Sequence, residues 1–192
     1  MRNASELINP SAPAGKSQQY AKRERERRFL LREVPDGKIT KSVDITDRYF
    51  AGTRLRLRQM RERTGDTTRT YYKFTQKIAA PDGRPGLLST IYLSEEEFVL
   101  FSGLPGMLLR KTRYSIPPFG VDVFAPPLSG LILAECEFND DVTMNSFSPP
   151  DWVVAEVTGD SRFTGGQLAA TDPENLTQLL LSLGVTPPAT LR

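Results

Sequence analysis

Hydrophobic and polar residues alternate with a period of two along much of this chain, as they do in β-strands that bury one face. The alternation is clearest at residues 42–50, 53–59 and 70–78, which are also rich in β-branched and aromatic residues. Gly52 and the segment RTGDTT (63–68) supply turn residues between these strands. Further strand candidates follow at 87–93, 107–115, 119–124, 131–138 and 151–158.

Three short helices are predicted among and after these strands. Ser94 can cap a helix over 94–101, because the three glutamates that follow it favour the positive end of the helix dipole. A second short helix is predicted near 166–170. Asp172 and Pro173 open a last helix over 173–184, in which leucines recur at helical spacing.

The segment AKRERERRFLLREV (21–34) allows two interpretations. Glu, Arg and Leu are good helix formers, so propensity favours a charged helix. An alternating strand is equally open, with Glu24, Glu26 and Arg28 on one side and Arg25 and Phe29 on the other. The local pattern does not choose between the two.

About eight strands with a few short helices favour a mainly β (α+β) fold, an eight-stranded antiparallel closed β-barrel with short covering helices. A chain of 192 residues with 39% hydrophobic residues suits one domain. We assign this domain to residues 21–192, including the C-terminal helix. Residues 1–20 are rich in Ser, Ala, Pro and Gly and are predicted to form a flexible N-terminal arm.

Composition excludes several kinds of chemistry. The chain has no histidine, so histidine general bases, Ser-His or Cys-His triads and imidazole zinc sites are ruled out. Its single cysteine, Cys136, cannot form an internal disulfide and fits a cytoplasmic protein. A net charge of +2 does not indicate a nucleic-acid partner, and the sequence has no apolar run of membrane-spanning length.

The charges of the strands are sorted by face and by sign. The charged face of a half-buried strand is usually exposed to solvent. Like charges at i and i+2 repel, however, and a solvated surface normally mixes the signs. The segregation therefore favours polar faces that turn inward to bind an anion, beside carboxylates that hold Mg²⁺ or Mn²⁺. The basic faces carry Arg54, Arg56 and Arg58, Lys73 and Lys77, and Lys111 and Arg113, and the acidic face carries Glu135 and Glu137.

The order of these segments resembles the CYTH superfamily, or triphosphate tunnel metalloenzymes. That family opens with E-x-E-x-K before an apolar pair, and residues 24–30 are similar, with Arg28 in the place of the lysine. The resemblance covers about residues 22–170 and implies that the ambiguous segment forms the first strand. It continues through Tyr49, Arg56-Leu57-Arg58, Lys77, Lys111-Thr112-Arg113-Tyr114, Asp122-Val123-Phe124, Ala134-Glu135-Cys136-Glu137-Phe138 and Glu156-Val157-Thr158-Gly159-Asp160.

The resemblance implies an eight-stranded tunnel that binds a triphosphate together with Mg²⁺ or Mn²⁺. By position, it implies that Tyr49 and Lys111 help to activate the nucleophile, and that Asp122 supports metal or phosphate ligands. The acidic residues would hold metal or orient water, and the remaining basic residues would bind phosphates. The implied acidic set is Glu24, Glu26, Glu135 and Glu137, and the implied phosphate-binding set is Arg28, Arg56, Arg58, Lys77, Lys111 and Arg113.

One departure from the family bears on catalysis. A pair of glutamates usually points into the tunnel from the strand before the first helix, and Leu88 and Thr90 stand at those positions here. We therefore expect hydrolysis of inorganic triphosphate or a related small triphosphate, by a monomer or homodimer. The alternatives are a module that binds triphosphate, polyphosphate or nucleotide without turnover, and an adenylyl cyclase.

Overall fold

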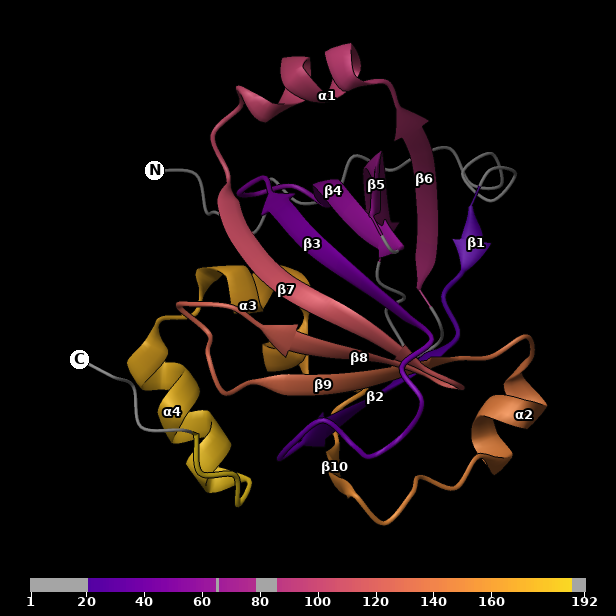
Figure 1. The fold of residues 1–192 in the computed structure, drawn as a ribbon. Coiled ribbons are helices and arrows are strands. Elements are labelled where there is room, and N and C mark those ends of the chain that lie inside the picture. The colour runs from indigo at the N-terminus through magenta and orange to yellow at the C-terminus, as the bar shows by residue number, and fades with distance from the viewer. Residues whose placement is uncertain (1–20, 65, 79–85, 188–192) are drawn as a thin grey trace.

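A computed structural model describes residues 21–64, 66–78 and 86–187 of the chain. The predicted arm at residues 1–20 lies outside this part, as does residue 65 and most of the Pro/Gly loop at 79–85. Within the described part the protein is mainly antiparallel β-sheet with a few short helices, as the alternation predicted (Figure 1).

The described strands form a single sheet in the order β1-β6-β5-β4-β3-β7-β8-β9-β2-β10. Every neighbouring pair in it is antiparallel. The strands are β1 (Lys22–Arg23), β2 (Glu26–Leu31), β3 (Lys41–Tyr49), β4 (Leu55–Thr64), β5 (Thr67–Ile78), β6 (Leu87–Leu93), β7 (Met107–Ile116), β8 (Phe119–Phe124), β9 (Ile132–Glu137) and β10 (Val153–Glu156).

The segment that was ambiguous in the sequence is extended, and it contacts strands from both ends of this order. Its first part, β1, pairs with β6, and the backbone N–H of Glu24 donates to Gly86 O at 2.9 Å. Its second part, β2, pairs with β9, where Glu26 lies opposite Glu137. One short stretch of chain therefore links β6 to β9, although seven strands separate β1 from β2 in the order of the sheet.

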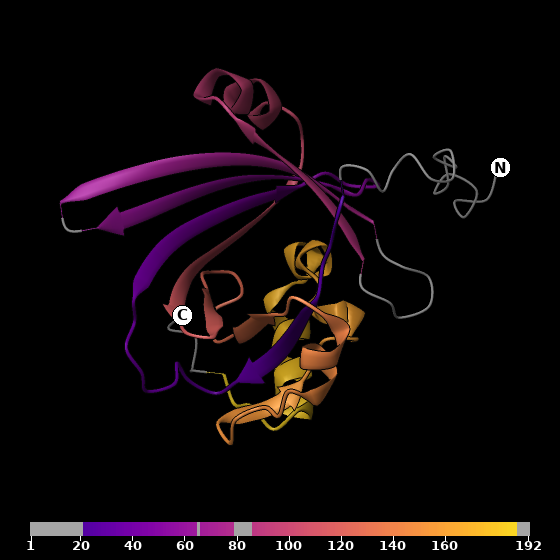
Figure 2. The same ribbon diagram turned by 90° about the vertical axis from the view of Figure 1, so that its right-hand side faces the viewer.

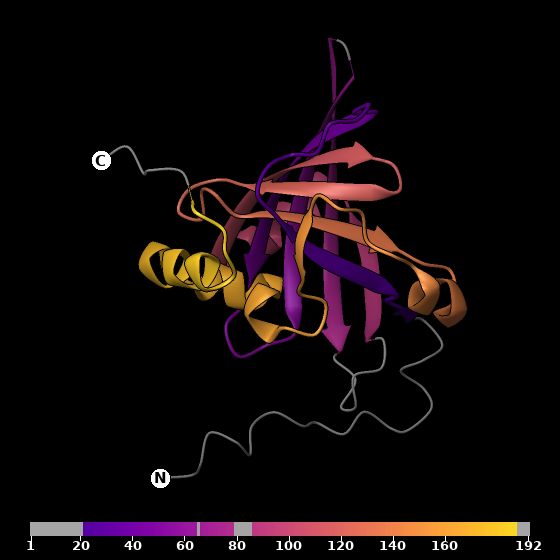
Figure 3. The same ribbon diagram turned by 90° about the horizontal axis from the view of Figure 1, so that it is seen from below.

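The helices agree with the prediction except for one that the sequence did not indicate. Helix α1 (Glu95–Ser102) begins with a capping box between Ser94 and Glu97, and α3 (Gly165–Ala170) and α4 (Pro173–Ser182) lie where expected. The unpredicted helix is α2 (Asp141–Ser146), which Asp140 caps. A 3-10 helix (Ser161–Phe163) precedes α3. Figure 3 shows α2 and α4 at opposite sides of the sheet.

Strands β4 and β5 are longer than the sequence indicated. The segment at 63–68 was expected to be a turn, but β4 extends to Thr64 and β5 begins at Thr67. Thr64 lies opposite Thr67, so cross-strand pairing continues almost to the tip of the hairpin. The turn is tighter than its composition suggested, because β-branched threonines on both sides favour extended backbone.

The helices cover different faces of the sheet. Phe98 and Phe101 of α1 stack on Tyr72 and Phe74 of β5, with ring centroids 4.4 and 4.7 Å apart. We expected the last helix to cover the apolar exterior too, but α3 and α4 pack against Leu30 and other apolar residues on the opposite face. Figure 2 shows these two helices on the concave side of the curved sheet. They pack there because the lining of that side is apolar at one end, at Leu30, Leu109, Phe124 and Leu133.

A second apolar cluster lies on the convex side of β2, β8 and β9. Phe29, Cys136 and Phe119 are buried there, and Trp152 packs edge-on against Phe119 with centroids 4.9 Å apart. Cys136 is a buried free thiol and Trp152 is a packing residue. Among the described helices, none combines the length and the apolar character needed to cross a membrane.

Replacing Leu180 by alanine should destabilise the protein by roughly 2–5 kcal/mol, because α4 buries this side chain completely in the concave-side core. The neighbouring Leu181 is 53% exposed. Leu181→Ala should therefore change the free energy of unfolding by less than about 1 kcal/mol. Urea denaturation of both variants checks this, and equal losses would show that α4 is not docked as described.

Candidate active site

Pairing across the sheet places the charged stripes of several strands on its concave face. Residues directly opposite one another in antiparallel strands share a face. Tyr49 lies opposite Arg56, and Arg56 opposite Thr75. In the adjacent row, Asp47 lies opposite Arg58, and Arg58 opposite Lys73. The side chains that the sequence predicted to face inward therefore include basic residues of β4 and β5 that lie side by side.

Asp47 is a charged residue of the concave face that was not among the site residues predicted from the sequence. It is fully buried, and its two carboxylate oxygens accept from Arg58 Nε at 2.6 Å and Arg58 Nη2 at 2.8 Å. Arg56 Nε lies 3.7 Å from Asp47 Oδ1. Burial alone would raise the pKa of Asp47, but the Arg58 guanidinium outweighs it and holds the pKa below its ordinary value. Asp47 has the same parity as Tyr49 in its strand, which is the signal that could have identified it.

A second buried carboxylate, Asp122, joins β8 to β7. Arg113 donates from Nε to Oδ1 and from Nη2 to Oδ2, both at 2.6 Å, and Lys111 Nζ bonds the same carboxylate. Arg113 Nη2 also donates to Glu135 of β9. Burial lowers the pKa of Lys111, an effect that Asp122 partly offsets. Asp122 is completely enclosed by these partners.

The acidic residues of β2 and β9 surround Arg28. Its guanidinium bonds Glu26 through Nη2 and Glu135 through Nε, the latter at 3.0 Å. Burial, and then repulsion by Glu135, raises the pKa of Glu26 to about 7. Lys77 Nζ lies 2.5 Å from Glu24 and 4.0 Å from Glu26, so it adds a further cation at this end of the face.

Several predicted residues lie at the margin of this arrangement. Arg54 precedes β4, which begins at Leu55 rather than at residue 53, and its side chain is exposed. Glu137 is 74% exposed and pairs with Lys22 at 3.6 Å. Lys73 Nζ lies 5.0 Å from the ring centroid of Tyr92. Arg54 and Glu137 are exposed and Lys73 is half-buried, whereas Asp47 and Asp122 are fully buried.

The two positions at which the resemblance to the CYTH superfamily led us to expect acids face the same side. Leu88 lies opposite Lys77, and Thr90 lies opposite Thr75 with their hydroxyl oxygens 3.1 Å apart. Strand β6 therefore presents an apolar side chain, Leu88, and a neutral hydroxyl, Thr90, at these positions. Neither supplies a negative charge for a metal.

Tyr49 is enclosed by the start of α3. A Cβ atom on Gly165 would fall 1.9 Å from the Tyr49 hydroxyl, so any side chain at this position would have to displace the Tyr49 ring. Burial, and then the Asp47 carboxylate, raises the pKa of Tyr49 above its ordinary value. Lys111 lies opposite Ile45, four residues before Tyr49 in β3, and no described hydrogen bond joins Lys111 to Tyr49.

Arg56 has the one buried side-chain polar atom, among the described residues, that lacks a hydrogen-bond partner. Its Nε is too far from Asp47 Oδ1, at 3.7 Å, for a hydrogen bond. A buried donor without a partner is destabilising, and an oxygen of a bound anion would satisfy it.

The acids of this face suit a divalent metal that shares its ligands with a substrate. Within the described residues no three acidic side chains are grouped closely enough to form a complete protein cage. Mg²⁺ commonly takes one or two carboxylates and completes its shell with water and substrate phosphates. Glu24 and Glu26, beside Lys77, fit that kind of site.

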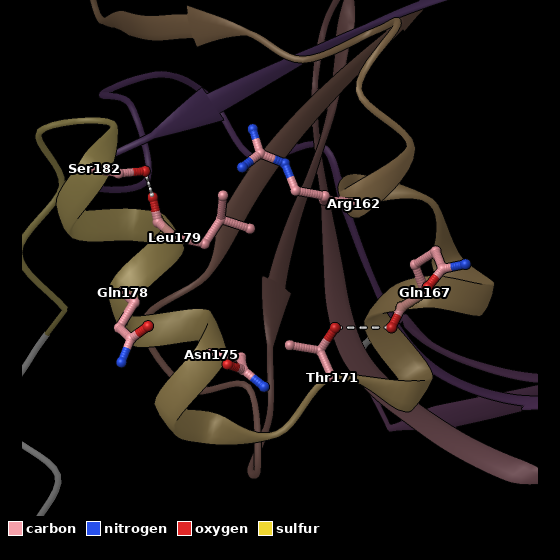
Figure 4. Close-up of a pocket in the computed structure, with 7 residues that line it drawn as sticks. All are labelled: Arg162, Gln167, Thr171, Asn175, Gln178, Leu179 and Ser182. Carbon is pink, nitrogen blue, oxygen red and sulfur yellow. Dashed lines mark hydrogen bonds between the residues drawn. The ribbon is translucent and has the colours of Figure 1, made fainter.

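A separate hollow of about 390 Å³ lies between α3 and α4 (Figure 4). Two of its hydroxyl groups already donate within their own helices, Thr171 Oγ1 to Gln167 O and Ser182 Oγ to Leu179 O. Its lining includes none of the predicted site residues. The lining residues are Arg162, Gln167, Thr171, Asn175, Gln178, Leu179 and Ser182.

Comparisons with known proteins show relatives over most of this chain. No family model matches the chain. An inorganic triphosphatase of Nitrosomonas europaea is 34% identical over 157 residues, which are 77% of this chain and 97% of that protein. A crystal structure of the inorganic triphosphatase NE1496 superposes with a TM-score of 0.52 and 29% identity, over 77% of this chain and 95% of that one. Another crystal structure of NE1496, described as a hypothetical protein, gives the same TM-score of 0.52 and covers 98% of that chain.

Replacing Asp47 by asparagine should destabilise the protein by roughly 3–5 kcal/mol at neutral pH, because Arg58 is left buried without its counter-ion. Since the pKa of Asp47 is lowered by folding, its stabilising charge is present above the unfolded-state pKa and is lost as pH falls through the folded-state value. The difference in urea midpoint between wild type and variant should therefore shrink below about pH 4.

The matched control for this prediction is Asp44→Asn, on the opposite face of the same strand. Asp44 is 44% exposed and pairs with Arg63 at 3.3 Å, so its loss should have a much smaller effect. If both variants lose the same stability at neutral pH, the Asp47–Arg58 pair does not hold β3 to β4 as described.

Proposed function

Because the chain belongs to the family of inorganic triphosphatases, we propose that it hydrolyses inorganic triphosphate, or a related small triphosphate, with the help of Mg²⁺ or Mn²⁺. The protein is a triphosphatase by this relationship. The observation that supports the substrate is the concave face, where basic residues of β2, β4, β5 and β7 converge and Arg56 presents an unpaired buried donor.

We also assign the fold to the CYTH kind and infer that the concave face is the inside of a closed tunnel. The support is the double pairing of residues 22–31, which bond β6 at their start and β9 at their end. In the proposed tunnel, this double pairing is what would make the sheet continuous around the charged residues. A closed β-barrel has no free edges along its wall and can keep a polar interior.

The basic residues divide into two roles. Arg58 and Arg113 each give two hydrogen bonds to a buried carboxylate, so their main contribution is a fixed positive potential. Arg56 and Lys77 have donors left for phosphate oxygens. Lys73, Arg54 and Arg28 contribute charge from the margin and the acidic end of the same face.

Hydrolysis needs a water molecule aligned with the terminal phosphorus and a leaving group whose charge is stabilised. The oxygen of the water bonds to phosphorus while the bridging P–O bond breaks, which yields phosphate and pyrophosphate. Mg²⁺ or Mn²⁺ supplies charge neutralisation of the phosphate oxygens when bound. Glu24, Glu26, Glu135 and Glu137 are proposed to hold the cation or orient the water, and Asp122 supports them by fixing Lys111 and Arg113.

Lys111 and Tyr49 are proposed to assist the attacking water. Burial lowers the pKa of the Lys111 ammonium, and its bond to the Asp122 carboxylate fixes the position of the amine. Tyr49 lies at the α3 end of the concave face, where its hydroxyl can orient a water. The free buried thiol of Cys136 is consistent with the proposed cytoplasmic location.

A binding module without turnover is the second candidate. It is favoured by Leu88 and Thr90, which leave one wall of the site without carboxylates. Such a module would retain the basic face, and hence affinity for a triphosphate, while lacking part of the metal site. The two functions differ in whether the metal is needed for binding.

Purified protein should release phosphate from tripolyphosphate in the presence of Mg²⁺ or Mn²⁺, since cationic residues and a metal together neutralise the reacting oxygens. The control is Glu24→Gln/Glu26→Gln, which removes the carboxylates beside Lys77. If wild type releases no more than this control, while tripolyphosphate still raises its melting temperature in chelator, the binding module is the correct function.

Arg56→Met should lower kcat/KM for tripolyphosphate by about 10²–10³-fold, the effect of losing one donor that stabilises a reacting oxyanion. Folding should be affected less than in Asp47→Asn, because Arg56 Nε has no hydrogen bond to lose and Asp47 keeps both of its bonds from Arg58. Arg61→Met, on the exposed opposite face of the same strand, is the matched control. Equal kinetics in the two variants would exclude Arg56 from the substrate site.

A further inference from the structure

Arg28 bonds three oxygen atoms from three different segments of the protein. Nη2 donates to Glu26 Oε1 on the same strand, Nε donates to Glu135 Oε1 on β9 at 3.0 Å, and Nη1 donates to Phe163 O at 3.1 Å. The side chain is only 10% exposed. Because all three guanidinium nitrogens are engaged, the group is held in one position and cannot swing aside without losing several bonds at once.

The position of this guanidinium is the place where a cation would bridge the two acids. Glu26 and Glu135 belong to neighbouring strands, and their side chains are 17% and 14% exposed. Two buried carboxylates that approach one another repel unless a positive charge lies between them. A divalent metal or a guanidinium can fill that role, but the two cannot occupy the same space.

The other acids of the face are paired in a similar way. Lys77 contacts Glu24 at 2.5 Å, Arg58 holds Asp47, and Arg113 binds both Asp122 and Glu135. Arg28 differs from these cations because it alone bonds both Glu26 and Glu135 among the described residues. It is therefore the residue that decides whether this pair of acids can serve as metal ligands.

We infer that Arg28 is a built-in counter-ion that takes the place of a divalent cation between Glu26 and Glu135. In the substrate-free protein it keeps metal from bridging these two carboxylates. Glu24 and Glu26, beside the partly exposed Lys77, would then be the residues left to hold a metal that shares its ligands with substrate phosphates. The inference rests on the proposed function in taking these acids as part of the triphosphate site.

The test is calorimetric titration of Mn²⁺ into the full-length protein without substrate. Arg28→Met should bind Mn²⁺ at least about tenfold more tightly than wild type, because Glu26 and Glu135 lose the cation that bonds both of them. Mn²⁺ should also raise the melting temperature of the variant more than that of wild type. The gain in affinity should disappear in Arg28→Met/Glu135→Gln, which removes one of the two ligands.

Arg27→Met is the matched control, since Arg27 is the adjacent arginine and pairs with Glu156 on the other side of the strand at 2.6 Å. It should bind Mn²⁺ as wild type does. Equal Mn²⁺ affinities of wild type and Arg28→Met would overturn the inference. So would an equal gain in Arg27→Met.

Arg28→Lys decides the question if Arg28→Met does not fold. Lysine keeps the charge but lacks the planar fork that binds two carboxylates, so Mn²⁺ affinity should rise by about threefold or more. No rise in this folded variant would contradict the inference. Loss of the proposed function would show separately, as a wild type that releases no phosphate from tripolyphosphate.

Discussion

The need to neutralise buried carboxylates governs the arrangement of this protein. An isolated charge removed from water is strongly destabilising, whereas a paired and hydrogen-bonded one can be accommodated. Asp47, Asp122 and Glu135 each accept from arginine or lysine on a neighbouring strand. These pairs link β3 to β4, β7 to β8 and β9, and β2 to β9. The network therefore holds together the wall that carries the active site.

The same network sets which charges remain for a substrate. A cation that is locked by a carboxylate contributes a fixed field but has few donors to offer, while Arg56 and Lys77 retain them. Electrostatic catalysis depends on groups that are oriented before the reaction, so that little reorganisation is needed when charge develops. Ion pairs that restrain Arg58 and Arg113 meet that requirement even though these arginines have little capacity for new bonds.

Apolar packing completes the concave side. Helices α3 and α4 cover its apolar end, and the start of α3 is so close to Tyr49 that a side chain at Gly165 would displace the tyrosine ring. This packing keeps bulk water from one end of the charged face, which strengthens the interactions within it. Helix α1 performs a different task on the convex side, where its phenylalanines cover aromatic residues of β5.

Strands β6 and β8 could be predicted with their observed bounds, because Pro, Gly or helix-capping residues flank them on both sides. Helix α2 could not, since DVTMNS has weak helical propensity and depends on the cap from Asp140. Arg54 was placed with Arg56 and Arg58 by parity, but the strand begins after it. The closed barrel remains a proposal supported by the double pairing of residues 22–31.

The sequence by itself determined which side chains of a strand share a face, because the two-residue repeat is a property of extended backbone. That was enough to group Arg56 with Arg58, Lys111 with Arg113, and Glu135 with Glu137. Only the tertiary structure decided which cation meets which carboxylate. Arg28 and Glu135 are 107 residues apart in the chain, and they bond because β2 and β9 pair in one register. Strand order and register depend on the packing of the whole sheet, and no local pattern contains them.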